Sequence, residues 1–117
     1  MHELGLCTSI VDAVEKRAGR RAVAQVRVRV GQLHHVHPEA FGQSFAVAAM
    51  GTVAEDATAE LVLVPVRARC RACAAAWDCE DVPLACGGCG SVEVDMIGGD
   101  ELVLEWVRYK ARDGERT

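Results

Sequence analysis

Hydrophobic residues recur at helical spacing near the start of the chain. Within residues 3–19 this pattern is formed by Leu4, Cys7, Val11, Val14 and Ala18. Spacings of three and four residues place these side chains on one face of an α-helix. Gly19 follows as a stop signal, with Lys16 and Arg17 in the last turn, as is common where helices end. The segment therefore predicts an amphipathic helix.

A second helical pattern occupies residues 37–50, "HPEAFGQSFAVAAM". Pro38 suits the first helical position, because its missing N–H would have no partner there. Phe41, Phe45 and Ala48 form the expected apolar stripe. We therefore expect a helix that begins at Pro38 and buries its phenylalanines.

The strands are predicted by alternation and by apolar runs. Residues 22–33 alternate strictly, with Val26, Val28 and Val30 on one face, which is typical of a half-buried strand. Residues 59–70, "AELVLVPVRARC", are apolar on both faces around Leu61 to Val64. We expect this strand to be central, with its ladder interrupted at Pro65.

The remaining segments complete an α+β fold. "VEVDMI" (92–97) and "LVLEWVRYK" (102–110) predict closing strands joined by the turn "GGDE". A small β-sheet packed by two helices, with an inserted zinc-ribbon-like four-cysteine domain, accounts for the order of elements. We expect residues 1–66 and 92–117 to form one α/β domain and residues 67–91 to form a cysteine-rich insert that binds metal.

Charge and apolar content limit the function classes. The formal net charge is −4 over 117 residues, and an acidic chain is repelled by a nucleic-acid backbone. Glu3 stands where a signal peptide would be basic, and no stretch reaches the roughly 18 apolar residues of a membrane span. We therefore expect a cytoplasmic protein, in which paired cysteines bind metal more often than they form disulfides.

Four cysteines show the spacing of a metal site, C-x2-C-x12-C-x2-C. They are Cys70, Cys73, Cys86 and Cys89. Two C-x2-C turns can present four thiolates to one ion, and a closed site of four sulfur ligands selects zinc and leaves no position for catalysis. The alternative is a redox pair or two disulfides. Of the other cysteines, Cys7 is interpreted as a buried small hydrophobe, and Cys79 as a loop residue rather than a spare ligand.

The opening residues "MHE" form a possible chelator. The amine of Met1, the backbone nitrogen of His2 and Nδ1 of His2 can close two rings around one ion. Three nitrogens in a plane suit Ni(II) or Cu(II), and Glu3, another histidine or water could supply a fourth ligand. The alternative is that His2 has no role, because first residues are usually frayed.

Five stretches, taken together, resemble the HypA (HybF) family of hydrogenase nickel-incorporation proteins: "MHELGL", "VRVGQL", "VHPEAFGQSF", the two Cys pairs with "CGGCGS", and "GGDELVLEWV". The resemblance implies a non-enzymatic nickel metallochaperone for NiFe-hydrogenase maturation. It implies His2 as the essential nickel ligand with Met1 and Glu3 beside it, and the four cysteines as ligands of a structural zinc. The implied partners are a HypB-type GTPase and the hydrogenase large subunit precursor, with the chaperone a monomer or a weak homodimer.

The sequence departs from the family pattern at "GQLHHVHPE". His34, His35 and His37 stand where small or acidic residues are usual. Three imidazoles could bind a second nickel ion or complete the first site, but we favour a polar loop in which His37 lies near a helix N-cap. The alternative function is a zinc-ribbon interaction or regulatory module without nickel delivery. An enzyme is disfavoured, because no nucleophile is paired with a base and an orienting group.

Overall fold

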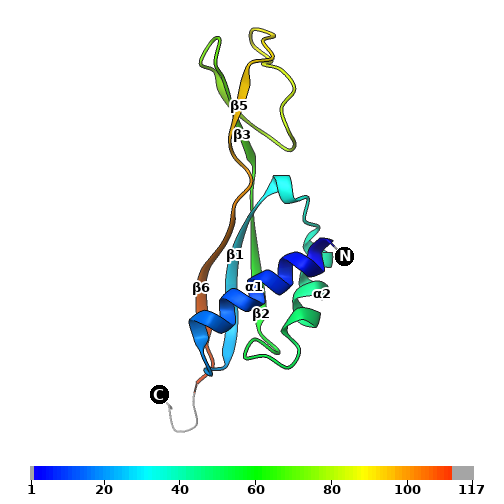
Figure 1. The fold of residues 1–117 in the computed structure, drawn as a ribbon, viewed down its shortest axis with the longest axis vertical. Coiled ribbons are helices and arrows are strands. Elements are labelled where there is room, and N and C mark those ends of the chain that lie inside the picture. Colours follow the sequence, from blue (N-terminus) through cyan, green and yellow to red (C-terminus); the bar gives the residue numbers. More distant parts are fainter. Residues whose placement is uncertain (1, 112–117) are drawn as a thin grey trace. The chain divides into compact units, whose positions relative to one another are not determined.

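The computed structural model describes residues 2–111 (Figure 1). Met1, residues 112–117 and the side chain of His2 lie outside the described residues. The elements in order are α1 (His2–Ala18), β1 (Val23–Gly31), the 3₁₀ turn η1 (Gln32–His34), α2 (Pro38–Ala49), β2 (Thr58–Val64), β3 (Val66–Cys70), β4 (Ala76–Cys79), β5 (Val94–Gly98) and β6 (Leu102–Tyr109). The α+β class predicted from the sequence is confirmed.

The chain divides into two compact units. Of the described residues, the first unit comprises 2–28, 36–61 and 104–111, and the second comprises 29–35 and 62–103. The predicted insert, 67–91, falls inside the second unit. No helix in the described part of the chain is long and apolar enough to cross a membrane.

Helix α1 forms where the apolar stripe predicts it. Cys7, Val11 and Val14 are buried, and Ile10, which the prediction did not include, is buried with them. The helix ends because Gly19 adopts a left-handed conformation at φ 64°. In this position its N–H donates to the carbonyl of Glu15 at 2.9 Å, which caps an otherwise unpaired carbonyl.

Helix α2 begins at Pro38, as predicted, with His37 as its N-cap residue. The buried stripe is Phe41, Phe45 and Ala49, so the prediction of Ala48 as the third member is wrong by one position. The observed residues are spaced by four, which keeps them on one face. The two helices pack against each other, and the Cys7 thiol donates to the carbonyl of Phe41 at 3.6 Å.

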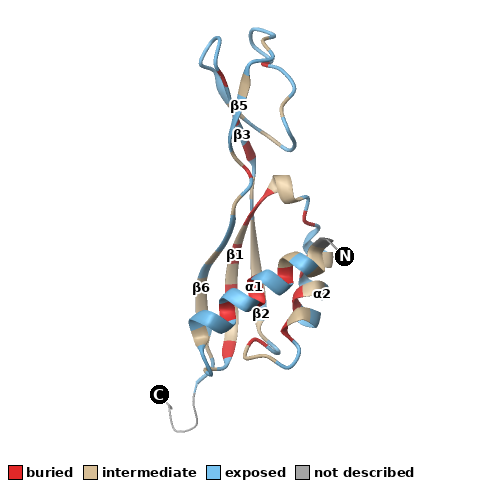
Figure 2. Cartoon of the chain, in the orientation of Figure 1, coloured by how far each residue is buried: buried red, intermediate tan, exposed pale blue. Residues whose placement is uncertain are grey.

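One sheet has the strand order β2-β1-β6. Central β1 buries Val26, Val28 and Val30 completely, which confirms the alternation, and Figure 2 shows buried stretches along β1 in red. On its other face Arg27 pairs with Glu60 of β2 at 3.3 Å and with Glu105 of β6 at 3.1 Å. Within the first unit, helices α1 and α2 provide further buried side chains, and Val23, Val36 and Ala54 are buried outside the helices.

The prediction that residues 59–70 form a central strand is wrong for β2, which lies at an edge of its sheet. An apolar run indicates how the faces of a strand are covered, but it does not indicate whether both of its hydrogen-bonding edges are paired. The interruption at Pro65 is confirmed, because β2 ends at Val64 and β3 begins at Val66.

A second three-stranded sheet has the order β4-β3-β5 and belongs to the second unit. Both neighbours run antiparallel to β3, and the registers pair Val66 with Cys79 and Cys70 with Val94. Central β3 buries Val66, Ala68 and Cys70. This sheet therefore ends at the first cysteine of the metal-binding spacing.

Candidate metal centres

The four cysteines of the spacing motif come together in the second unit. Their sulfur atoms, from Cys70, Cys73, Cys86 and Cys89, all lie within 4.8 Å of one another. The Sγ atoms of Cys70 and Cys89 are 3.6 Å apart, and those of Cys73 and Cys86 are 3.7 Å apart. The prediction that the two pairs converge is therefore confirmed, and all of the chain's cysteines are free of disulfides.

The two C-x2-C turns have the same backbone geometry. In the first, the N–H of Ala74 donates to the carbonyl of Cys70 at 2.9 Å; in the second, the N–H of Gly90 donates to that of Cys86 at 2.8 Å. Both donors have positive φ, 65° at Ala74 and 77° at Gly90. Of the three glycines that the sequence places around Cys89, Gly90 alone needs the conformational freedom of glycine.

Backbone N–H groups in these turns favour the thiolate form. The N–H of Cys89, followed by that of Gly88, lowers the pKa of Cys86 to about 7. The N–H of Cys73, 3.5 Å from the sulfur of Cys70, is the main cause that lowers the pKa of Cys70. Thiolates are the form of cysteine that binds metal.

The donor set and its dimensions fit zinc. Zinc bound tetrahedrally at about 2.3 Å from each sulfur separates the sulfurs by about 3.8 Å. Two of the separations, 3.6 and 3.7 Å, agree with this value, and all four sulfurs lie within 4.8 Å of one another. Four protein ligands close the coordination sphere, so such an ion is structural and cannot bind a substrate.

At the N-terminal end, the structure shows the backbone of His2 within α1 and the side chain of Glu3 in its first turn. The Glu3 carboxylate accepts a hydrogen bond from the backbone N–H of His37 at 3.3 Å. Met1 and the imidazole of His2, the predicted nickel ligands, lie outside the described residues. Glu3 therefore links the start of α1 to the N-cap of α2.

The three clustered histidines have separate partners. Nε2 of His34 lies 2.9 Å from the carbonyl oxygen of Asp100, and Nε2 of His35 lies 3.7 Å from the carboxylate of Asp81. His37 caps α2 with its backbone. In the described part of the chain, the four cysteines are the only group of three or more potential ligand residues close enough to share an ion. The loop interpretation of the histidines agrees with this arrangement.

The two remaining cysteines lie outside the cluster. Cys7 is fully buried, as predicted, and this burial, together with the charge of Glu3, raises its pKa to about 11. Cys79 is the last residue of β4 rather than a loop residue, and its thiol donates to the carbonyl of Asp81 at 3.2 Å. Neither is placed to act as a fifth thiolate.

Comparison with known proteins decides the family. The model of the family described as "Hydrogenase/urease nickel incorporation, metallochaperone, hypA" matches residues 1–109. This chain belongs to the HypA family. The HypA maturation factor of Trichodesmium erythraeum is 38% identical over 105 residues, which cover 90% of this chain and 92% of that protein. The Streptomyces avermitilis HypA is 37% identical over 115 residues, covering 94% and 88%.

The fold of this HypA-family chain also matches a solved structure. The solution structure of the nickel metallochaperone HypA from Helicobacter pylori aligns with a TM-score of 0.63 at 21% identity, covering 96% of this chain and all of that one. The family resemblance predicted from the sequence motifs is confirmed. The protein is a nickel metallochaperone of hydrogenase maturation, Ni(II) is its cargo, and its four-cysteine cluster fits a structural zinc ion.

Proposed function

We propose that this metallochaperone carries Ni(II) at its N-terminus, in the first unit, and holds zinc in the four-cysteine cluster of the second. His2 is the principal nickel ligand in this proposal, with the amine of Met1 and the carboxylate of Glu3 beside it. The observation that carries the proposal is the hydrogen bond from the N–H of His37 to Glu3. It holds the first turn of α1, which includes the backbone of His2, next to folded structure.

The chemistry of the two sites supports this division of roles. Four thiolates enclose an ion and exchange it with difficulty, which suits a structural metal and not a cargo. Nitrogen ligands at a chain end leave coordination positions open, so that a receiving protein can displace them one at a time. Square-planar nitrogen ligation also favours nickel over zinc.

A nickel metallochaperone requires a partner that receives the nickel ion, and a GTPase can couple the transfer to GTP hydrolysis. We propose a HypB-type GTPase and the hydrogenase large subunit precursor as these partners, in the cytoplasm, with the chaperone acting as a monomer or weak homodimer. The chain acts by binding and release and not as an enzyme. In support, the Cys7 thiol is fully buried, with its pKa raised to about 11, which makes it unsuitable as a nucleophile.

Nickel titration of zinc-loaded protein tests the proposal. Protein that begins at Met1 is compared with a version carrying one additional residue before Met1 and with His2→Ala. We expect both variants to keep zinc and fold but to lose most nickel binding. Because an amine and an imidazole with reference pKa values of about 8 and 6.5 must lose protons, nickel affinity should fall steeply from about pH 7.5 to 6.

Two further variants separate the roles of the other candidate ligands. Glu3→Gln can still accept a hydrogen bond from the N–H of His37 but cannot supply a charged ligand, so retained nickel binding assigns Glu3 to positioning. Replacing His34, His35 and His37 together with alanine should leave one nickel site. If the triple variant loses all nickel while His2→Ala keeps it, the nickel site has been assigned to the wrong residues.

A further inference from the structure

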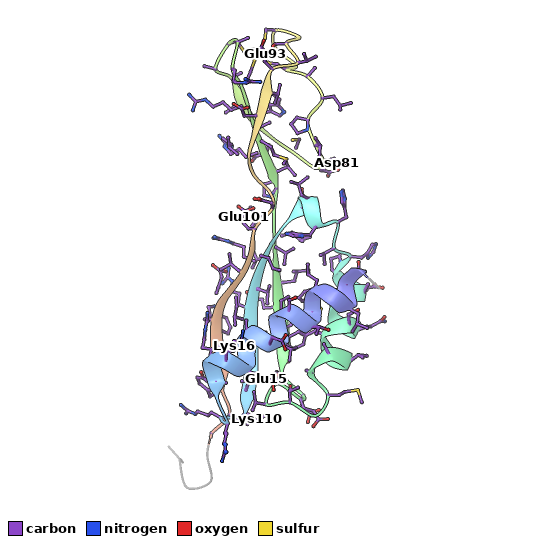
Figure 3. The ribbon with its side chains drawn as sticks, in the orientation of Figure 1. Glu15, Lys16, Asp81, Glu93, Glu101 and Lys110 are labelled. Atoms are coloured by element: carbon purple, nitrogen blue, oxygen red, sulfur yellow. The ribbon has the colours of Figure 1, made fainter. Side chains whose placement is uncertain are left out.

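Basic side chains gather at one end of the first unit. They are Lys16, Arg17, Arg20, Arg21 and Lys110, and we call them the basic end. The sequence separates Lys110 from the others by almost ninety residues, but its N–H donates to the carbonyl of Ala22 at 2.9 Å. Figure 3 labels Lys16 and Lys110 at this end, where α1 and β6 finish.

A concavity of about 490 Å³ lies within the basic end. Its lining residues are Ala18, Arg20, Arg21, Ala22, Lys110 and Ala111. Three of them are cations, three are alanines, and none is a carboxylate. The concavity therefore combines a concentrated positive charge with small apolar side chains, in a chain whose net charge is −4.

Stabilisation of helix α1 explains only some of the cations of the basic end. Lys16 and Arg17 lie in the last turn of the helix, where cations stabilise the helix dipole. Arg20 and Lys110 lie outside the helix and within the described residues have no ion pair with a carboxylate. Their charges are therefore available to an external anion.

The walls of the concavity are held in place. The guanidinium of Arg21 stacks over the ring of Tyr109, 4.5 Å from its centroid, and the N–H of Lys110 donates to the carbonyl of Ala22 at 2.9 Å. The carbonyl of Ala18 accepts from the N–H of Arg21 at 3.1 Å. Because these groups are ordered before any ligand arrives, binding costs less conformational entropy.

We propose that this concavity docks an acidic segment of a partner protein. Aspartate or glutamate side chains pair with Arg20 and Lys110, and their methylene groups lie on the alanines. An adjoining concavity of about 430 Å³ shares Arg20 and Lys110 but adds Glu55 and Asp56. These carboxylates limit the anion-binding region to the first concavity, where the alanines complement the methylene groups of a peptide, which a polyphosphate lacks.

The test uses a peptide of ten glutamates, added to full-length, zinc-loaded, ¹⁵N-labelled protein at low salt. We expect amide shifts at residues 18–22 and 109–111 that saturate, with an affinity that falls as salt is raised. Arg20→Gln and Lys110→Gln should each weaken binding about threefold, the scale of a single exposed ion pair. Arg69→Gln makes the same charge change on β3 of the second unit and should leave binding unchanged.

Three results would overturn the proposal. One is equal weakening by Arg69→Gln, which would show a response to net charge alone. Another is the absence of saturable shifts at the basic end. The third is that pyrophosphate or GTP binds these amides more tightly than the peptide does, which would assign the site to phosphate. Nickel and zinc contents of the variants are measured in parallel, so failure of the proposed nickel site is separable from failure of this one.

Discussion

A single methyl group at Gly31, the last residue of β1, should disrupt the contact between the end of that strand and the β5–β6 turn of the second unit. A Cβ built on Gly31 would lie 1.9 Å from the carbonyl oxygen of Gly99 and 2.1 Å from its carbon. Real Cβ atoms essentially never approach a neighbouring heavy atom within 3.0 Å, so the two backbones must separate by more than an ångström in Gly31→Ala. The backbone at Gly31, with φ −70° and ψ 147°, is one that alanine adopts without strain. Any loss of stability in Gly31→Ala is therefore caused by the clash with Gly99 and not by backbone strain at residue 31.

The expected magnitude follows from the hydrogen bonds that this separation breaks. The N–H of Gly31 donates to the carbonyl of Glu101 at 2.8 Å, and the N–H of Leu33 donates to that of Gly99 at 2.9 Å. Each such bond contributes about 1 kcal/mol net. Together with residual steric strain, Gly31→Ala should lower the free energy of opening of this segment by about 2–3 kcal/mol.

Amide hydrogen exchange at Leu33, measured on zinc-loaded protein, reports this loss directly. A decrease of 2–3 kcal/mol corresponds to exchange faster by about 30- to 150-fold. Gly42→Ala is the matched control, because a Cβ at Gly42 of α2 meets nothing within 4 Å. That variant should gain about 0.5–1 kcal/mol from helix propensity. Unchanged protection of Leu33 in Gly31→Ala would refute the reasoning.

Three further predictions concern the cysteines and a carboxylate. Cys73→Ala should lose its equivalent of zinc and the dispersed amide signals of the second unit while α1 and α2 keep theirs; full zinc content by mass spectrometry would contradict this. Cys7, fully buried with its pKa raised to about 11, should resist alkylation by iodoacetamide at pH 8, whereas half-buried Cys79 should react. Equal alkylation rates at the two cysteines would contradict the burial of Cys7. Backbone N–H groups of Glu101 itself and Gly99 lower the pKa of Glu101. A lowered folded pKa gives stability that is fully present above the ordinary value of 4.5 and is lost as pH falls through the folded value. The melting temperature of Glu101→Gln should therefore lie below that of the unsubstituted protein by a constant amount from pH 7 to 5. A difference that changes in this interval would contradict a lowered pKa of Glu101.

Local periodicity predicted the elements of this fold well. The apolar spacing around Val11 and Val14, Pro38 at the first turn of α2, and the alternation through Val28 each depend on neighbours a few residues away. The cysteine spacing predicted the metal cluster for the same reason, because each turn of the C-x2-C motif is local and zinc geometry then requires the two turns to meet.

Contacts between distant segments could not be read from the sequence. The edge position of β2 depends on β1 pairing with β6, which no pattern within β2 reveals. The hydrogen bond from the N–H of His37 to Glu3 joins residues 34 positions apart through a backbone group, which carries no residue-specific signal. In the sequence, Gly31 and Gly99 belong to two separate stretches that resemble the family. The structure shows that these two glycines lie against each other.

The two cysteine turns show how metal geometry can override local preference. Both require a left-handed residue four positions after their first cysteine, and the sequence supplies Gly90 in one turn but Ala74 in the other. Alanine in this conformation costs roughly 1–2 kcal/mol, so local propensity opposes the first turn. A bound zinc ion contributes on the order of 10 kcal/mol to folding in small zinc domains, which offsets this cost several times over. Zinc bound by the four thiolates would therefore maintain the conformation of Ala74, and the closed four-thiolate geometry that would do so also makes this ion unsuitable as cargo.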